Sequence, residues 1–79
     1  TLDNTIMEVL TNRMKIIEEI GTYKKQNNIT ILQPDRWEKI LTRVLEEARK
    51  NNLSEELVER VFKAIHQASI DRQTDIMNE

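Results

Sequence analysis

Apolar residues recur with a helical period through the first third of this chain. Their steps of three and four residues are the spacing of one face of an α-helix. The residues that follow this spacing are Leu2, Ile6, Val9, Leu10, Ile16, Ile17 and Ile20. The pattern predicts a helix from about Leu2 to Gln26, roughly 37 Å long at 1.5 Å per residue. A long helix of this kind needs a partner surface along much of its length.

Two shorter helices are predicted downstream. Pro34 suits the first turn of a helix, where its missing N–H is harmless, and the second helix is expected to run to about Lys50. Its inner face is expected to carry Trp37, Ile40, Leu41, Val44, Leu45 and Ala48. Ser54 is a good N-cap for a third helix that ends near Met77. The expected inward residues of this helix are Leu57, Val61, Phe62, Ile65, Ala68 and Ile76. Residues 29–33 are interpreted as a loop.

The sequence therefore predicts an all-α fold of three helices, a long first one and two shorter ones. Seventy-nine residues form one domain, spanning 1–79. A chain this short buries only about 60% of its unfolded surface. It contains no cysteine, so no disulfide can support the core. Because the first helix is much longer than the second, part of its apolar stripe lacks a cover within the chain. We expect a second chain to share this core.

Composition and charge exclude several classes of function. The formal net charge is −2, whereas nucleic-acid-binding domains usually carry a basic face. No apolar run approaches the roughly 20 residues that span a bilayer, and no signal peptide is visible, so no membrane partner is expected. The absence of cysteine fits a cytoplasmic protein. His66 is the only histidine, which argues against a metal site.

Polar side chains interrupt the apolar stripes. Arg13 lies four residues after Val9, and Lys24 continues the same stripe of the first helix; Arg36 lies one turn before Ile40 on the second helix. On the third helix, Ser69 and Gln73 follow Ile65 at steps of four. Buried charges need partners, and the acidic residues mostly lie on outward faces. Inward cations without such partners indicate an anionic ligand.

Each of these residues alone has a simpler interpretation. Arg13 or Lys24 can extend its charged end to solvent, Ser69 can pack between helices, and Gln73 can belong to a frayed helix end. Gly21, inside the first helix, is either a tolerated weak point or a place where something packs against the backbone. The chain has no Gly-rich phosphate loop and no Ser/His/Asp set. An enzyme built this way would act through electrostatics and positioning.

Taken in order, these residues resemble the all-helical chorismate mutases over essentially the whole chain. The likeness rests on Arg13, Gly21 and Lys24 in the first helix, on Pro34-Asp35-Arg36 at the start of the second, and on Ser69-Ile70-Asp71-Arg72-Gln73 near the end of the third. The resemblance implies an intertwined homodimer whose long first helices span both subunits. It also implies two active sites, no cofactor, and the Claisen rearrangement of chorismate to prephenate in phenylalanine and tyrosine biosynthesis.

The resemblance also implies a role for each site residue. Arg13 would pair with a substrate carboxylate, and Ser69 would help to hold one. Lys24 would contact a carboxylate and the ether oxygen of the breaking C–O bond, and Gln73 would donate to that oxygen from the other side. Arg36 would add positive potential. Negative charge grows on the ether oxygen in the transition state, so fixed donors there lower the barrier.

The chain departs from the family pattern at three places. Trp37 stands where the family commonly has a Glu that binds the substrate hydroxyl, and Gln33 stands where an acidic residue is frequent; either residue is a candidate contact to the substrate. An Arg that the family usually carries about two turns upstream of Leu2 lies before the first residue given. Family members are often fused to another enzyme of the same pathway. The start at Thr1 is consistent with a domain cut from such a fusion, the missing domain lying upstream.

Three alternatives stay open at the level of sequence. An isochorismate pyruvate lyase would use similar cations, and it would release pyruvate and salicylate. A helical dimerisation or regulatory module without turnover would explain the missing Glu and Arg. A DNA-binding three-helix domain is the third alternative, and the acidic charge balance argues against it.

Overall fold

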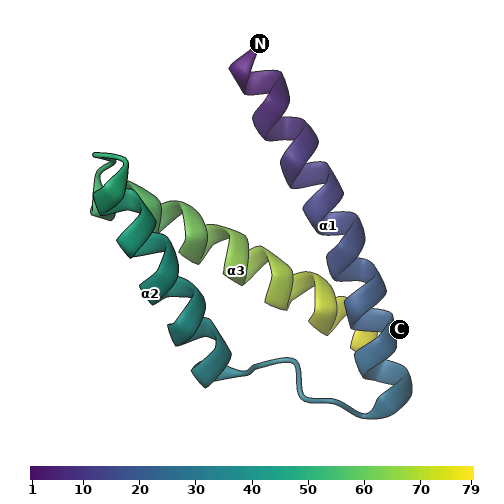
Figure 1. Ribbon diagram of the computed structural model, residues 1–79. Helices are drawn as coiled ribbons and strands as arrows, with labels where there is room; N and C mark the ends of the chain where they lie inside the picture. The colour runs from purple at the N-terminus through teal and green to yellow at the C-terminus, as the bar shows by residue number, and fades with distance from the viewer. The chain divides into compact units, whose positions relative to one another are not determined.

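The computed structural model describes residues 1–79 and is all-α, as the sequence predicts. It contains three helices, α1 (Leu2–Asn27), α2 (Pro34–Lys50) and α3 (Glu55–Met77) (Figure 1). The chain divides into two compact units, one formed by Thr1–Ile31 with Ser69–Glu79 and the other by Leu32–Ala68. Helix α3 contributes to both. None of the three helices combines the length and apolar character needed to cross a bilayer.

Local hydrogen bonds define the ends of α1. The Thr1 hydroxyl oxygen accepts from the backbone N–H of Asn4 at 3.2 Å, which satisfies one of the free donors of the first turn. At the other end, Asn28 adopts the left-handed conformation with φ 54°. The N–H of Ile29 then donates to the Lys24 carbonyl at 2.9 Å. Asn tolerates this conformation better than most residues, so the expected end of the helix is confirmed.

The connection between α2 and α3 is also built from its own residues. Asn52 has φ 55°, and the N–H of Leu53 donates to the Ala48 carbonyl at 2.9 Å. The Ser54 hydroxyl oxygen accepts from the backbone N–H of Leu57 at 3.2 Å. Ser54 is therefore the N-cap of α3, as predicted. Pro34 is the first residue of α2, and residues 29–33 contain no helix or strand, so the predicted loop is confirmed.

The first unit packs α1 against the C-terminal end of α3. Its buried residues are Gly21, Ser69, Gln73 and Ile76. Arg72 of α3 also reaches Glu18 of α1, with its Nε 3.5 Å from a carboxylate oxygen. This small interface contains two polar side chains where an ordinary core would have apolar ones.

The second unit is a hairpin of α2 and the first part of α3, which run in opposite directions (Figure 1). Val44 and Ala48 are buried, 6% and 1% exposed. The other residues expected on the inner face of α2 are half-buried, namely Trp37, Ile40, Leu41 and Leu45. Arg49 and Glu55 pair across the turn at 2.6 Å. The predicted inner face of α2 is confirmed.

Apolar residues are exposed on two helices, and on α1 this is the expected stripe without a cover within the chain. Four apolar residues on the predicted inner face of α1 are more than half exposed, namely Leu2, Ile6, Val9 and Ile16. On α3 the expectation of an inward position is wrong for Leu57, Val61 and Ala68, which are exposed in the chain. Periodicity shows which face of a helix is apolar, but it does not show which surface covers that face. No large side chain is fully buried anywhere in the chain.

Candidate active site

Gln73 is the most unusual buried residue of the first unit. It is only 5% exposed, and its Nε2 donates to the backbone carbonyl of Ser69 at 3.2 Å. Its Oε1 is buried and has no hydrogen-bond partner. A buried acceptor left without a hydrogen bond lowers the stability of the fold by about 1–3 kcal/mol. Such an atom in a native protein often has a functional reason. Nε2 also carries a second hydrogen, which can donate a hydrogen bond to a bound molecule.

Ser69 lies one turn before Gln73 on α3 and is 6% exposed. Both residues belong to the buried face of the helix, together with Ile76. The prediction that Ser69 and Gln73 point inward is confirmed. A hydroxyl and a carboxamide are therefore held on one face of α3, beside the C-terminal part of α1.

Lys24 brings a positive charge to the same unit. Its side chain is half-buried, and Nζ lies 3.4 Å from the backbone carbonyl of Ile31, a long hydrogen bond. Helix α1 contacts α3 at Gly21, where a Cβ would lie 3.4 Å from Gln73 Cα. Lys24 is three residues further along α1, which places it on the same face. The unit thus positions an ammonium and a buried carboxamide on two helices that touch.

Arg13 lies on the same face of α1 as Lys24 but outside the core. Eleven residues separate the two, close to three full turns, or roughly 16 Å along the helix. The expectation that Arg13 points into the chain's own core is wrong, because Arg13 is exposed. Its stripe neighbours Val9 and Ile16 are exposed as well. Arg13 makes no ion pair within its unit, so its guanidinium is available to an anion.

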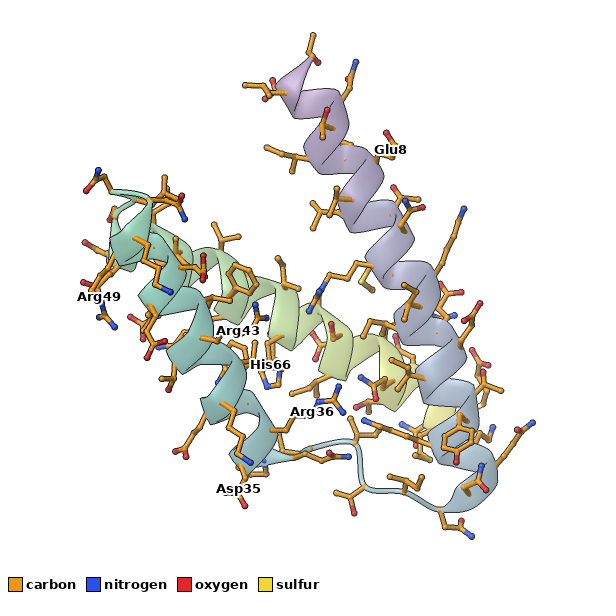
Figure 2. All side chains as sticks on the ribbon, viewed as in Figure 1. Glu8, Asp35, Arg36, Arg43, Arg49 and His66 are labelled. Atoms are coloured by element: carbon orange, nitrogen blue, oxygen red, sulfur yellow. The ribbon has the colours of Figure 1, made fainter.

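The second unit carries the remaining candidates at the start of α2. Gln33 is the residue before the helix and is half-buried. Arg36 is exposed and makes no ion pair within its unit, so the expected inward position is wrong here too. Arg36 and Asp35 both belong to the first turn of α2, and Figure 2 labels them on different sides of it. Arg36 comes one residue before Trp37, so it lies about 100° around the helix axis from the inner face that begins at Trp37.

Trp37 stacks on His66 of α3. The two ring centroids are 4.1 Å apart and the rings are nearly parallel, at 6°, and Figure 2 shows His66 on the side of α3 that faces α2. Burial lowers the pKa of His66 below its ordinary value of 6.5, because a charged imidazolium loses solvation there. Stacking holds the Trp37 indole in one orientation.

Sequence reasoning missed the structural role of His66. The available signal was its spacing, because Phe62, His66, Ser69 and Gln73 follow one another at steps of four, three and four. This spacing places His66 on the same stripe of α3 as the two buried polar residues. The sequence did not reveal that its partner would be Trp37.

A helical domain with a half-buried lysine, a buried carboxamide and arginines without ion pairs in their units carries the residue types that an anion-binding α-helical protein needs. Comparison with known proteins identifies it further: the chain belongs to the chorismate mutase type II family, whose sequence model matches residues 1–74. The resemblance to this family that was noted in the sequence is confirmed. The comparisons do not favour the lyase, the module without turnover or the DNA-binding domain over this assignment.

A curated relative is the bifunctional chorismate mutase/prephenate dehydratase of Buchnera aphidicola subsp. Schizaphis graminum (strain Sg). It is 29% identical over 77 residues, which is 98% of this chain. The chain spans only 20% of the length of that relative. No solved structure matches the chain.

Proposed function

We propose that this chain rearranges chorismate to prephenate, with Lys24 and Gln73 as the catalytic residues. The observation that carries the proposal is that one unit contains both the half-buried Lys24 side chain and the buried Gln73 carboxamide. Both groups donate hydrogen bonds, and neither is a nucleophile or a metal ligand in this role. Such a pair suits a reaction that needs charge stabilisation alone.

The chemistry matches these donors. In the rearrangement the ether C–O bond breaks while a C–C bond forms, and no proton is transferred. Electron density accumulates on the ether oxygen in the transition state. Lys24 Nζ and the second hydrogen of Gln73 Nε2 would both point at this oxygen. Donors fixed in advance in a poorly hydrated site stabilise the transition state more than the ground state.

The other candidates would hold the substrate. Arg13 is an exposed cation without an ion pair in its unit, and we assign it to a carboxylate of chorismate, where guanidinium and carboxylate match geometrically. Arg36, also exposed, would add positive potential. Ser69 would help to hold one carboxylate. Gln33 and Trp37 would contact the ring and its hydroxyl, since Trp37 offers an apolar surface where the family commonly has Glu.

We also propose that the active protein is a homodimer. Leu2, Ile6, Val9 and Ile16 are more than half exposed along α1. Fully burying a side chain of this size contributes about 1.5–3 kcal/mol, and a second copy offers the same apolar stripe in return. Arg13 lies within this stripe, so a partner helix would bring it into an enclosed site.

The chain is further proposed to be one domain of a longer enzyme. It spans 20% of its curated relative, and the name of that relative includes a second activity, prephenate dehydratase. A fused domain that consumes prephenate would act on the product of this one.

The test is turnover by the purified chain and by Lys24→Ala and Gln73→Ala. Chorismate is the substrate, and prephenate is quantified by NMR, with isochorismate in a parallel reaction. Each substitution is expected to lower kcat by about 10²–10³-fold, the effect of removing one oxyanion-hole donor. The control is Thr11→Ala, an exposed position of α1, which is expected to retain wild-type kcat.

Two results would overturn the proposal. Release of pyruvate and salicylate from isochorismate, without prephenate from chorismate, would assign the chain to the lyases. Unchanged kcat in both alanine variants would remove Lys24 and Gln73 from the catalytic site.

A further inference from the structure

We propose that Gly21 is a positioning residue that holds the Gln73 carboxamide in its catalytic place. It does so by allowing α1 and α3 to approach closely at the turn of α3 that bears Gln73. The inference rests on the proposed function, since it concerns a group assigned there to catalysis. It adds a residue that contacts no substrate and acts through its neighbour.

The geometry shows how little space is available at this position. Gly21 is buried within α1. A Cβ built on Gly21 would lie 3.0 Å from Ile76 Cδ1 and 3.4 Å from both Gln73 Cα and Gln73 Cγ. Two of the three nearest atoms therefore belong to Gln73, one of them in its backbone. Ile76 lies three residues after Gln73, on the same face of α3.

The backbone conformation does not explain the glycine. Gly21 has no positive φ, so any amino acid could adopt its conformation. Glycine inside a helix costs about 1 kcal/mol relative to alanine, and this is the only glycine in the chain. The remaining reason is space, because a side chain here would occupy volume that Gln73 and Ile76 already fill.

The neighbours of Gly21 differ in their ability to move. Ile76 Cδ1 is the end of a flexible side chain and can shift by a few tenths of an ångström. Gln73 Cα belongs to the backbone of α3 and moves only if the helix moves. Alanine at position 21 would thus meet mainly Ile76, whereas the two γ carbons of valine would extend beyond the Cβ position into this contact. We expect valine to displace Gln73.

Displacement of Gln73 would affect catalysis more than binding. The carboxamide is proposed to act on charge that develops only in the transition state, and misplacement by about 1 Å can cost about 100-fold in rate. Gly21→Val is therefore expected to lower kcat by about 100-fold with a smaller change in KM. Gly21→Ala, whose Cβ would disturb mainly Ile76 Cδ1 and would meet Gln73 Cα and Cγ at 3.4 Å, is expected to lower kcat less. The matched control is Glu19→Val, which places the same side chain at an exposed position of α1.

A double-mutant cycle separates positioning from general packing. If Gly21 acts through Gln73, Gly21→Val causes no further loss of kcat in a chain that already carries Gln73→Ala. Equal losses in both backgrounds would overturn the inference. Circular dichroism and thermal unfolding of each variant show that the helices are formed, and Gly21→Ala keeps the series usable if the valine variant does not fold.

A readout without turnover tests the inference independently of the enzyme assignment. The side-chain amide signals of Gln73, identified by their absence in Gln73→Ala, report the bond from Nε2 to the Ser69 carbonyl in an NMR spectrum. We expect these signals to shift in Gly21→Val and to stay in place in Glu19→Val. A chain without turnover whose Gln73 signals still shift would refute the proposed function and leave the positioning intact. Unchanged Gln73 signals in both Gly21 variants would refute the positioning role.

Discussion

The Gln73 carboxamide is the group on which the proposed chemistry of the site depends. Its Nε2 donates to the Ser69 carbonyl, and its Oε1 is buried without a donor. A leucine of similar size would avoid this cost, as an apolar replacement in a core is often neutral or stabilising. A carboxamide at this position therefore indicates that its hydrogen-bonding capacity serves the function of the chain at the expense of fold stability. The group supplies a neutral donor whose protonation does not change with pH.

We predict that Gln73→Glu makes turnover dependent on pH. A carboxylate has no hydrogen to donate, so the variant is expected to lose about 10²–10³-fold in kcat at neutral pH. A protonated carboxyl group does donate, and burial raises the pKa of a carboxyl. Activity should therefore increase as the pH falls. The measurement is kcat against pH, with Gln73→Leu as the control whose low kcat should not recover in acid.

The contact between Trp37 and His66 gives a second prediction at this scale. Burial lowers the pKa of His66, so between the folded-state pKa and 6.5 the unfolded chain binds more protons than the folded one. The stability that His66 contributes is thus present above about pH 6.5 and is lost as the pH falls towards the folded-state pKa. His66→Phe keeps an aromatic ring against Trp37 but cannot be protonated. It should lose less stability than the wild type on acidification.

Urea unfolding at about pH 7.5 and pH 5.5, on either side of the unfolded-state pKa, provides the measurement. Fluorescence follows Trp37 without ambiguity because it is the only tryptophan. Exposed carboxylates contribute equally to the pH dependence of stability in both proteins. The difference between wild type and His66→Phe in the stability lost on acidification therefore isolates the contribution of the histidine. Identical losses of stability in the two proteins would show that His66 does not contribute.

Among the helices, α3 depends on the cap at its start. The Ser54 hydroxyl accepts from the Leu57 N–H at 3.2 Å, and removal of an N-cap oxygen typically costs about 1 kcal/mol. Ser54→Ala is expected to lower the free energy of unfolding by about this amount while kcat stays unchanged. Ser54→Asp keeps an oxygen acceptor and is the matched control. Equal unfolding midpoints for Ser54→Ala and Ser54→Asp would show that the cap is unimportant.

The helices themselves could be predicted because their signals are local. Pro34, Ser54 and the Asn pairs define ends through their own hydrogen bonds or dihedral angles, and the structure places the ends within a residue or two of the prediction. The burial of Ser69 and Gln73 followed from the spacing of the α3 stripe. Helix and buried face are properties of a few consecutive turns, so a single sequence contains them.

The rest depends on contacts between residues far apart in the chain. Arg13 and Arg36 follow the stripe spacing, yet both are exposed, because spacing does not say whether a covering surface exists. The stacking of Trp37 on His66 joins positions 29 residues apart. Gly21 was ambiguous until the atoms facing it were known. Long-range packing decides each of these features, and no local pattern records it.

Across the whole molecule, two small cores are surrounded by exposed apolar residues. Only Val44, Ala48 and Ile76 are buried hydrophobic residues, a small number for a chain that must offset the conformational entropy of 79 residues. The exposed stripe of α1 ends close to the proposed catalytic residues, since Ile16 is five residues before Gly21. Covering this stripe would stabilise the same helix that positions Lys24. Stability and catalysis are therefore expected to depend together on association.

This dependence leads to a prediction about protein concentration. If a second copy covers α1, the unfolding temperature should rise with concentration, because association favours the folded state by mass action. Val9→Glu places a charge in the stripe, and it should abolish this rise and yield a monomer by sedimentation. Because a buried charge needs a partner, the substitution should also lower the free energy of unfolding by more than about 2 kcal/mol per protomer. Thr11→Glu introduces the same charge two residues away, off the stripe, and should leave both properties unchanged. An unfolding temperature independent of concentration in the wild type would show that the single chain is stable with its stripe exposed, and would overturn the proposed dimer.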